Sequence, residues 1–119
     1  IRLRFNSASF GGAIGTQGTS TVSISNSLIE GNFASGNQGG GVHFDNGTLS
    51  IRSSTIINNS GGGAGGITLV GFIGSASISN TLITGNSSAG AGGIAFRGSS
   101  FSSLVEDSVI SNNLSAASG

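Results

Sequence analysis

The sequence predicts an all-β fold: a right-handed, single-stranded parallel β-helix of about four turns, with three strands in each turn of about 27 residues. Three observations support this prediction. A nine-residue segment returns at a constant spacing, and apolar residues recur in short clusters with the period of two that is typical of strands. Glycine, serine and asparagine separate these clusters, and no cluster has a helical pattern.

The nine-residue segment Ile24–Asn32 has three further copies in the chain. They are Ile51–Asn59, Ile78–Asn86 and Val105–Asn113, each 27 residues after the one before. A remnant of an earlier copy, Leu3–Asn6, precedes all four. Chance does not keep nine positions in register over four copies, so the segment is a structural repeat.

A glycine pair before an apolar residue also recurs, but its spacing varies. The copies are Gly11-Gly12-Ala13-Ile14, Gly40-Gly41-Val42, Gly65-Gly66-Ile67 and Gly92-Gly93-Ile94. Ten residues separate Asn32 from Val42, whereas eight separate Asn59 from Ile67, and the following segment makes up the difference. A change in length that is absorbed within one repeat indicates a coil of fixed circumference.

Each repeat contains three apolar clusters, which we expect to be its three strands. The first contains Ile67 and Leu69, the second contains Val22 and Ile24, and the third centres on Ile29 and its equivalents. The expected turns are approximately 1–10 (partial), 11–37, 38–63, 64–90 and 91–119. Together they form a single segment, 1–119, which we expect to be part of a longer solenoid, because a solenoid needs a cap at each end.

Polar residues are expected to form columns at the corners of the coil. One column consists of Asn32, Asn59, Asn86 and Asn113, because asparagine tolerates a left-handed backbone and its amide can bond to its neighbours in a ladder. A second consists of Asn26, Ser53, Asn80 and Asp107. The glycine pairs are expected to permit positive φ or close approach at the third corner. We interpret all three columns as structural.

The motifs Ile-x-Asn-Ser-x-Ile-x-Gly-Asn and Gly-Gly-Ile resemble the repeats of polymorphic outer-membrane proteins and related bacterial surface β-helix proteins. The tetrapeptide Gly11-Gly12-Ala13-Ile14 is the one that defines polymorphic membrane proteins. The resemblance extends from Leu3 to Asn113. It implies an extracellular or cell-surface location and a role in adhesion or as a structural rod.

No enzymatic activity, metal or cofactor is expected. Polysaccharide-degrading enzymes with this fold need clustered carboxylates, and the acidic residues here are scattered. Glu106 and Asp107, for example, are adjacent, so their side chains should point to different sides of a strand. His43 alternates with Val42 and Phe44 and is therefore expected to face outward as an ordinary surface side chain.

Composition limits the partners. Four arginines balance four acidic residues, so there is no basic surface for nucleic acid. No apolar run is long enough for direct insertion into a membrane. Leu28, Ile57, Leu82 and Val109 are expected to form an exterior apolar stripe on the third strand, which meets other copies of the chain or other solenoid segments. The alternative is that a bend before Ile29 turns this stripe inward.

The sequence thus favours a non-enzymatic, extracellular or cell-surface β-solenoid of structural or adhesin type. We expect it to assemble end to end or side by side into a filament or surface layer, and to meet host or cell-surface glycans. The alternative function is that of a fragment from a carbohydrate-binding or polysaccharide-degrading β-helix protein whose active turns lie outside this segment.

Overall fold

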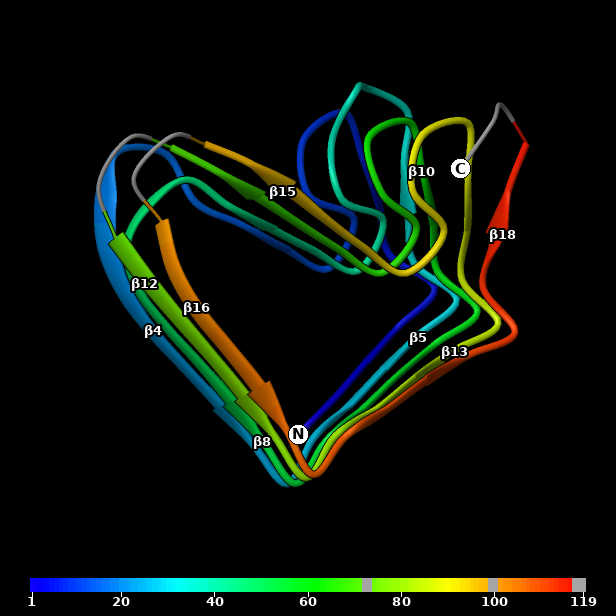
Figure 1. Cartoon of the computed structure of the whole chain (residues 1–119). Coiled ribbons are helices and arrows are strands. Elements are labelled where there is room, and N and C mark those ends of the chain that lie inside the picture. Colours follow the sequence, from blue (N-terminus) through cyan, green and yellow to red (C-terminus); the bar gives the residue numbers. More distant parts are fainter. Residues whose placement is uncertain (72–73, 99–100, 117–119) are drawn as a thin grey trace.

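The computed structural model describes residues 1–71, 74–98 and 101–116. Within these residues the chain forms eighteen β-strands and no helix. Every strand pairs in parallel with its equivalents in the neighbouring turns, so the chain is a parallel β-solenoid, as predicted (Figure 1). The right-handed winding stays a prediction. Residues 72–73, 99–100 and 117–119 of the expected turns 64–90 and 91–119 lie outside the described residues.

Four parallel sheets form the walls of the coil. Sheet A contains β1 (Arg2–Arg4), β5 (Leu28–Glu30), β9 (Thr55–Ile57), β13 (Leu82–Thr84) and β17 (Val109–Ser111). Sheet B contains β2 (Ser7–Ala8), β6 (Phe33–Ala34), β10 (Ser60–Gly61), β14 (Ser87–Ser88) and β18 (Leu114–Ser115). Sheet C contains β3 (Ile14–Gly15), β7 (Val42–Phe44), β11 (Ile67–Val70) and β15 (Ile94–Arg97). Sheet D contains β4 (Thr19–Ser25), β8 (Asn46–Arg52), β12 (Gly74–Ser79) and β16 (Phe101–Glu106).

Each full turn therefore has four strands, and the predicted number of three is wrong. Sheets C, D and A correspond to the three apolar clusters. Sheet B is the additional one, and each of its strands is only two residues long. Its residues share no apolar pattern, because Phe33 pairs with Ser7 and Ser60 at the same position. A search for alternating apolar residues could not detect such a strand.

The register of the sheets confirms the fixed circumference. In sheets A and D, equivalent residues such as Ile24, Ile51, Ile78 and Val105 pair directly. In sheet C, Val42 pairs with Ile14, 28 residues before it, and with Ile67, 25 residues after it. The drift of the first strand is thus a real difference in loop length.

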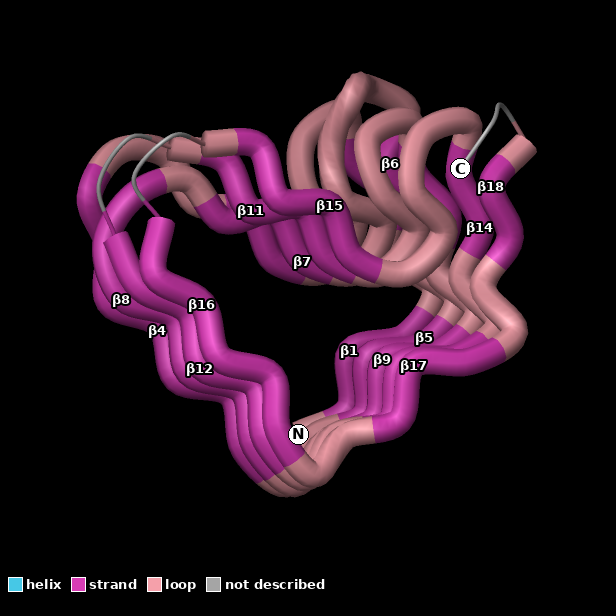
Figure 2. Tube along the Cα trace, in the orientation of Figure 1, coloured by secondary structure: helices cyan, strands magenta, loops and turns pink. Residues whose placement is uncertain are grey.

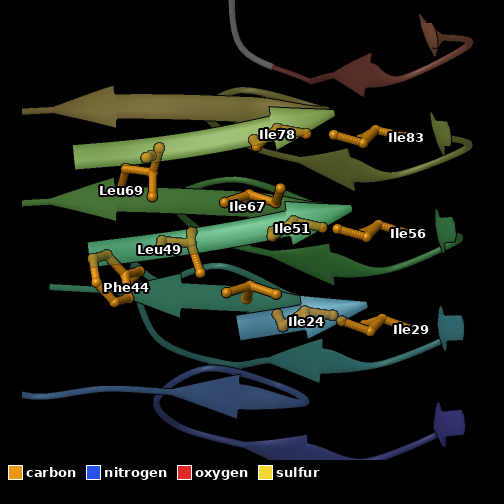
Figure 3. Close-up of a cluster of buried hydrophobic side chains, with 12 residues drawn as sticks. Ile24, Ile29, Phe44, Leu49, Ile51, Ile56, Ile67, Leu69, Ile78 and Ile83 are labelled. Carbon is orange, nitrogen blue, oxygen red and sulfur yellow. The ribbon is translucent and has the colours of Figure 1, made fainter. Parts of the chain in front are cut away.

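The coil is filled with stacked apolar side chains. In Figure 3 the pairs Ile24–Ile29, Ile51–Ile56 and Ile78–Ile83 lie one above another. Phe44, Leu49 and Leu69 belong to the same cluster on the side of sheets C and D. Each of these side chains is at most 6% exposed. Because a turn packs only on its neighbours, this core grows by one layer with every repeat.

Candidate functional site

The structure brings the four predicted asparagines together into a ladder inside the coil. Asn59 is representative: its Nδ2 donates to Asn86 Oδ1 at 3.0 Å and to the Ile29 carbonyl at 3.0 Å. Its Oδ1 accepts from both Nδ2 and the backbone N of Asn32, each at 2.9 Å. Asn32, Asn59 and Asn86 are at most 1% exposed. The amides therefore satisfy one another in an environment where an unpaired polar group is costly.

The ladder extends into the remnant repeat and into the last copy. Asn6 Nδ2 donates to Asn32 Oδ1 at 2.9 Å, and Asn86 Nδ2 donates to Asn113 Oδ1 at 3.0 Å. The left-handed backbone that we expected at these asparagines lies one residue earlier. It occurs at Phe5, Gly31, Asn58, Gly85 and Asn112, with φ between 53° and 65°. The turn at that residue directs the next side chain into the coil.

The second polar column lies at the bend between sheets D and A. Asn26, Ser53, Asn80 and Asp107 all have φ between 47° and 49°, which explains the small polar residues there. At the third corner the glycine pairs serve close approach, and only Gly11 among them has positive φ. A Cβ on Gly66, for example, would lie 2.6 Å from the carbonyl oxygen of Gly93 in the next turn.

The predicted stripe lies on the exterior of sheet A. Leu82 is 37% exposed and Val109 is 57% exposed, whereas Ile83, which follows Leu82 in β13, is fully buried. Leu28 and Ile57 are half-buried on the same outer face. These exposures contradict the alternative in which the stripe turns inward. Nothing in the structure shows what covers it.

His43 is not the exposed side chain that the alternation predicts. It does point away from the core, because Val42 and Phe44 on either side face inward and are fully buried. However, His43 is only 3% exposed, since the ring of Phe10 packs against it edge-on with ring centroids 4.4 Å apart. Phe10 comes from a loop one turn earlier, and no local pattern in the sequence could place it there.

Two buried polar atoms on this outer face have no hydrogen-bond partner. They are His43 Nδ1 and Thr68 Oγ1, which lie on directly paired residues of β7 and β11. Leaving such an atom unsatisfied costs about 1–3 kcal/mol. Burial lowers the pKa of the His43 imidazole from its ordinary value of 6.5, Asp45 opposes this effect and Arg97 adds to it. The imidazole is therefore neutral at neutral pH.

Beside His43 lies a pocket of about 530 Å³, which we call the sheet C pocket. It is lined by Phe10, Gln17, Asn37, Gln38, His43, Asp45, Val70 and Arg97. The loops from sheet B to sheet C, which rise out of the coil in Figure 2, contribute Phe10, Asn37 and Gln38 as one wall, and sheet C contributes His43, Val70 and Arg97 as the floor. Its volume falls within the roughly 300–1,000 Å³ typical of small-molecule sites. Sequence reasoning missed this pocket.

An insertion builds the wall of this pocket. The loop from β6 to β7 covers residues 35–41, two residues more than the equivalent loops 9–13, 62–66 and 89–93. The insertion is the irregular spacing between Asn32 and Val42, and it carries Asn37 and Gln38. The Gln38 carbonyl accepts a hydrogen bond from Gly63 N at 3.0 Å, which anchors the loop to the next turn.

Charged residues elsewhere do not assemble into a site. Arg4 pairs with Glu30 at 2.6 Å on the exterior of sheet A. Across residues 1–71, 74–98 and 101–116, no three histidine, cysteine or acidic side chains are grouped closely enough to hold a metal ion. The same residues contain no helix long and apolar enough to cross a membrane.

Comparison of the chain with protein-family models, with curated proteins and with solved structures gives no match.

Proposed function

We propose that this chain is a segment of a non-enzymatic extracellular or cell-surface β-solenoid, which serves as an adhesin-type structural rod in a filament or surface layer. One observation carries the proposal: the interior repeats the same contacts in every turn. The asparagine ladder and the stacked isoleucines need only an identical layer above and below them. Turns of this kind can therefore be added without changing any existing contact.

The turn that contains β17 shows which position a further turn would cover. Ile110 is 49% exposed, whereas Ile83, its equivalent one turn earlier, is fully buried. The strands of this turn also present a row of backbone groups at an edge. A further turn of the same kind, on this chain or on a second copy, would cover Ile110 and pair with that edge.

Sedimentation and electron microscopy test the assembly over a range of protein concentrations. We expect the chain to form elongated assemblies that grow with concentration, and Ile110→Asp to abolish them by placing a charge between two ends. Ser111→Asp is the matched control, because it adds the same charge to the outer face of the same strand and should still assemble. A chain that stays monomeric up to about 1 mM, or an Ile110→Asp variant that assembles normally, contradicts end-to-end assembly.

Location is tested separately with antibodies against the chain on cells that produce it. We expect the antibodies to label intact cells or the surrounding medium. Labelling that appears only after lysis contradicts an extracellular or cell-surface location.

The alternative is a segment of a carbohydrate-binding or polysaccharide-degrading protein. The sheet C pocket favours the binding part of this alternative, because it gathers amide side chains, an aromatic ring and a histidine with an unpartnered ring nitrogen in one place.

A further inference from the structure

We propose that the sheet C pocket binds a short stretch of an uncharged saccharide. The proposal does not depend on the assembly of the chain into rods, since the pocket lies entirely within the exterior of one segment. It rests on three features of the pocket: the buried histidine in its floor, its balanced charge and its amide-rich wall with an aromatic ring.

The floor of the pocket contains one buried polar side chain whose ring nitrogen lacks a partner. His43 is 3% exposed and lines the pocket, and its Nδ1 has no hydrogen-bond partner. Thr68, on the adjacent strand, also has an unpartnered Oγ1, but it is fully buried and does not line the pocket. A hydroxyl group can donate or accept a hydrogen bond, so it suits the neutral His43 imidazole in either tautomer.

The charges in the pocket cancel. Asp45 and Arg97 are the charged lining residues, and burial lowers the pKa of the His43 imidazole, which favours its neutral form. Both carboxylate oxygens of Asp45 are already engaged, Oδ2 by Gly18 N at 2.8 Å and Oδ1 by Asn46 Nδ2 at 3.0 Å. An anionic ligand would meet Asp45 and a cationic ligand would meet Arg97, so an uncharged ligand fits this lining best.

The wall of the pocket is suited to sugar hydroxyls. Gln17, Asn37 and Gln38 bring three side-chain amides, each with donors and an acceptor. Phe10 adds a half-buried aromatic ring, and Val70 adds an apolar surface. An aromatic ring beside several precisely placed polar groups matches a ligand that has apolar C–H faces and many hydroxyl groups.

The walls are held in place before any ligand arrives. The inserted loop is bonded to the next turn through Gly62 N to the Gly36 carbonyl at 3.2 Å and through Gly63 N to the Gln38 carbonyl. The ring of Phe10 is fixed by its edge-on contact with His43. Binding to a preformed pocket costs little free energy for the ordering of loops and side chains, which favours binding of a small ligand.

Titration of the whole chain with oligosaccharides tests this proposal. The probes are uncharged oligomers of glucose, mannose, xylose and N-acetylglucosamine, with galacturonate oligomers as the charged comparison. Saturation-transfer NMR and calorimetry measure the binding. We expect at least one uncharged oligomer to bind with a Kd of about 1 mM or tighter.

Variants show whether binding occurs in this pocket. Phe10→Ala should weaken the binding about tenfold, and Asn37→Ala and Gln38→Ala several-fold each. Phe33→Ala is the matched control, because Phe33 is 47% exposed on sheet B, away from the pocket, and should bind like the original chain. Circular dichroism checks the fold. If Phe10→Ala does not fold, Asn37→Ala carries the test, because Asn37 is exposed on a loop.

Three results overturn the proposal. The first is that no uncharged oligomer binds at about 10 mM while the chain is folded. The second is that binding is unchanged in the folded pocket variants. The third is that galacturonate oligomers bind more than about tenfold tighter than every uncharged oligomer, because recognition would then depend on charge. Each of these results leaves the rod proposal standing, since assembly is measured independently.

Discussion

The interior of the coil and the loops between sheets B and C obey different rules. Inside, Asn32, Asn59 and Asn86 make the same hydrogen bonds in each turn, at 2.9–3.0 Å. Outside, the second turn has an insertion, and Phe10 covers His43 in a contact that occurs once. Positions that contact their own copies are constrained to stay identical, whereas a loop that faces outward is free to differ. Contacts that occur in only one turn are therefore found in the loops that differ from turn to turn.

The largest expected effect comes from breaking the interior. In Asn59→Leu, the backbone N and Nδ2 of Asn32 both lose their acceptor, and the Ile29 carbonyl loses a donor. Buried groups without partners cost about 1–3 kcal/mol each, so we expect the free energy of unfolding to fall by about 3–6 kcal/mol. Chemical denaturation measures it.

Asn37→Ala is the matched control for this substitution, because it removes an exposed amide from the outer loop. Its free energy of unfolding should change by less than about 0.5 kcal/mol. Equal effects of the two substitutions on the free energy of unfolding would contradict a stabilising role of the ladder.

The stability of the chain is expected to depend on pH through His43, which lies between the core and the outer loops. Its neighbours with charge are Asp45 and Arg97, and burial holds its pKa below the unfolded value of 6.5. Between these two pKa values the unfolded chain binds a proton that the folded chain does not. The free energy of unfolding should therefore fall as the pH is lowered through about 6.5 and level off below the folded pKa.

Denaturation between pH 7 and pH 5 measures this effect, and His43→Phe should remove it. The test is clean because His43 is the single histidine of the chain. If the two chains have parallel pH profiles, the imidazole is not buried in its neutral form.

The smallest expected effect lies on the exterior, at the ion pair between Arg4 and Glu30. Their side chains are 45% and 24% exposed, so water screens the attraction. A double-mutant cycle with Arg4→Gln and Glu30→Gln should give a coupling of about 0.5 kcal/mol that shrinks in high salt. A coupling above about 2 kcal/mol would place this pair with the interior and weaken the distinction between the two regions.

The sequence predicts what depends on periodicity. The stacked isoleucines, the asparagine column, the drift of the first strand and the outward stripe all follow from positions that recur. Sheet B was missed because a two-residue strand has no period of its own. The left-handed backbone lies one residue before the position that we predict. That earlier residue is glycine in two copies and asparagine in the other two, whereas the residue after it is asparagine in all four, so only the later position stands out in the repeat.

The sheet C pocket could not be predicted for a different reason. It joins Phe10, the inserted loop and Arg97, which belong to different turns and follow no common pattern. The irregular spacing before Val42 was visible in the sequence, but only as a change in length. Its consequence depends on the path of the loop. The burial of His43 depends in the same way on Phe10, from the equivalent loop one turn earlier.

The asparagine ladder gives the coil a direction. In every rung the amide nitrogen donates toward the higher-numbered turn and the amide oxygen accepts from the lower-numbered one. The side-chain dipoles are therefore aligned along the axis, and each bond polarises the next. One end of the ladder presents donors and the other presents acceptors. If two identical ends met, donors would face donors or acceptors would face acceptors. Any joining that continues the ladder is therefore head to tail, and a filament built in this way has two chemically distinct ends.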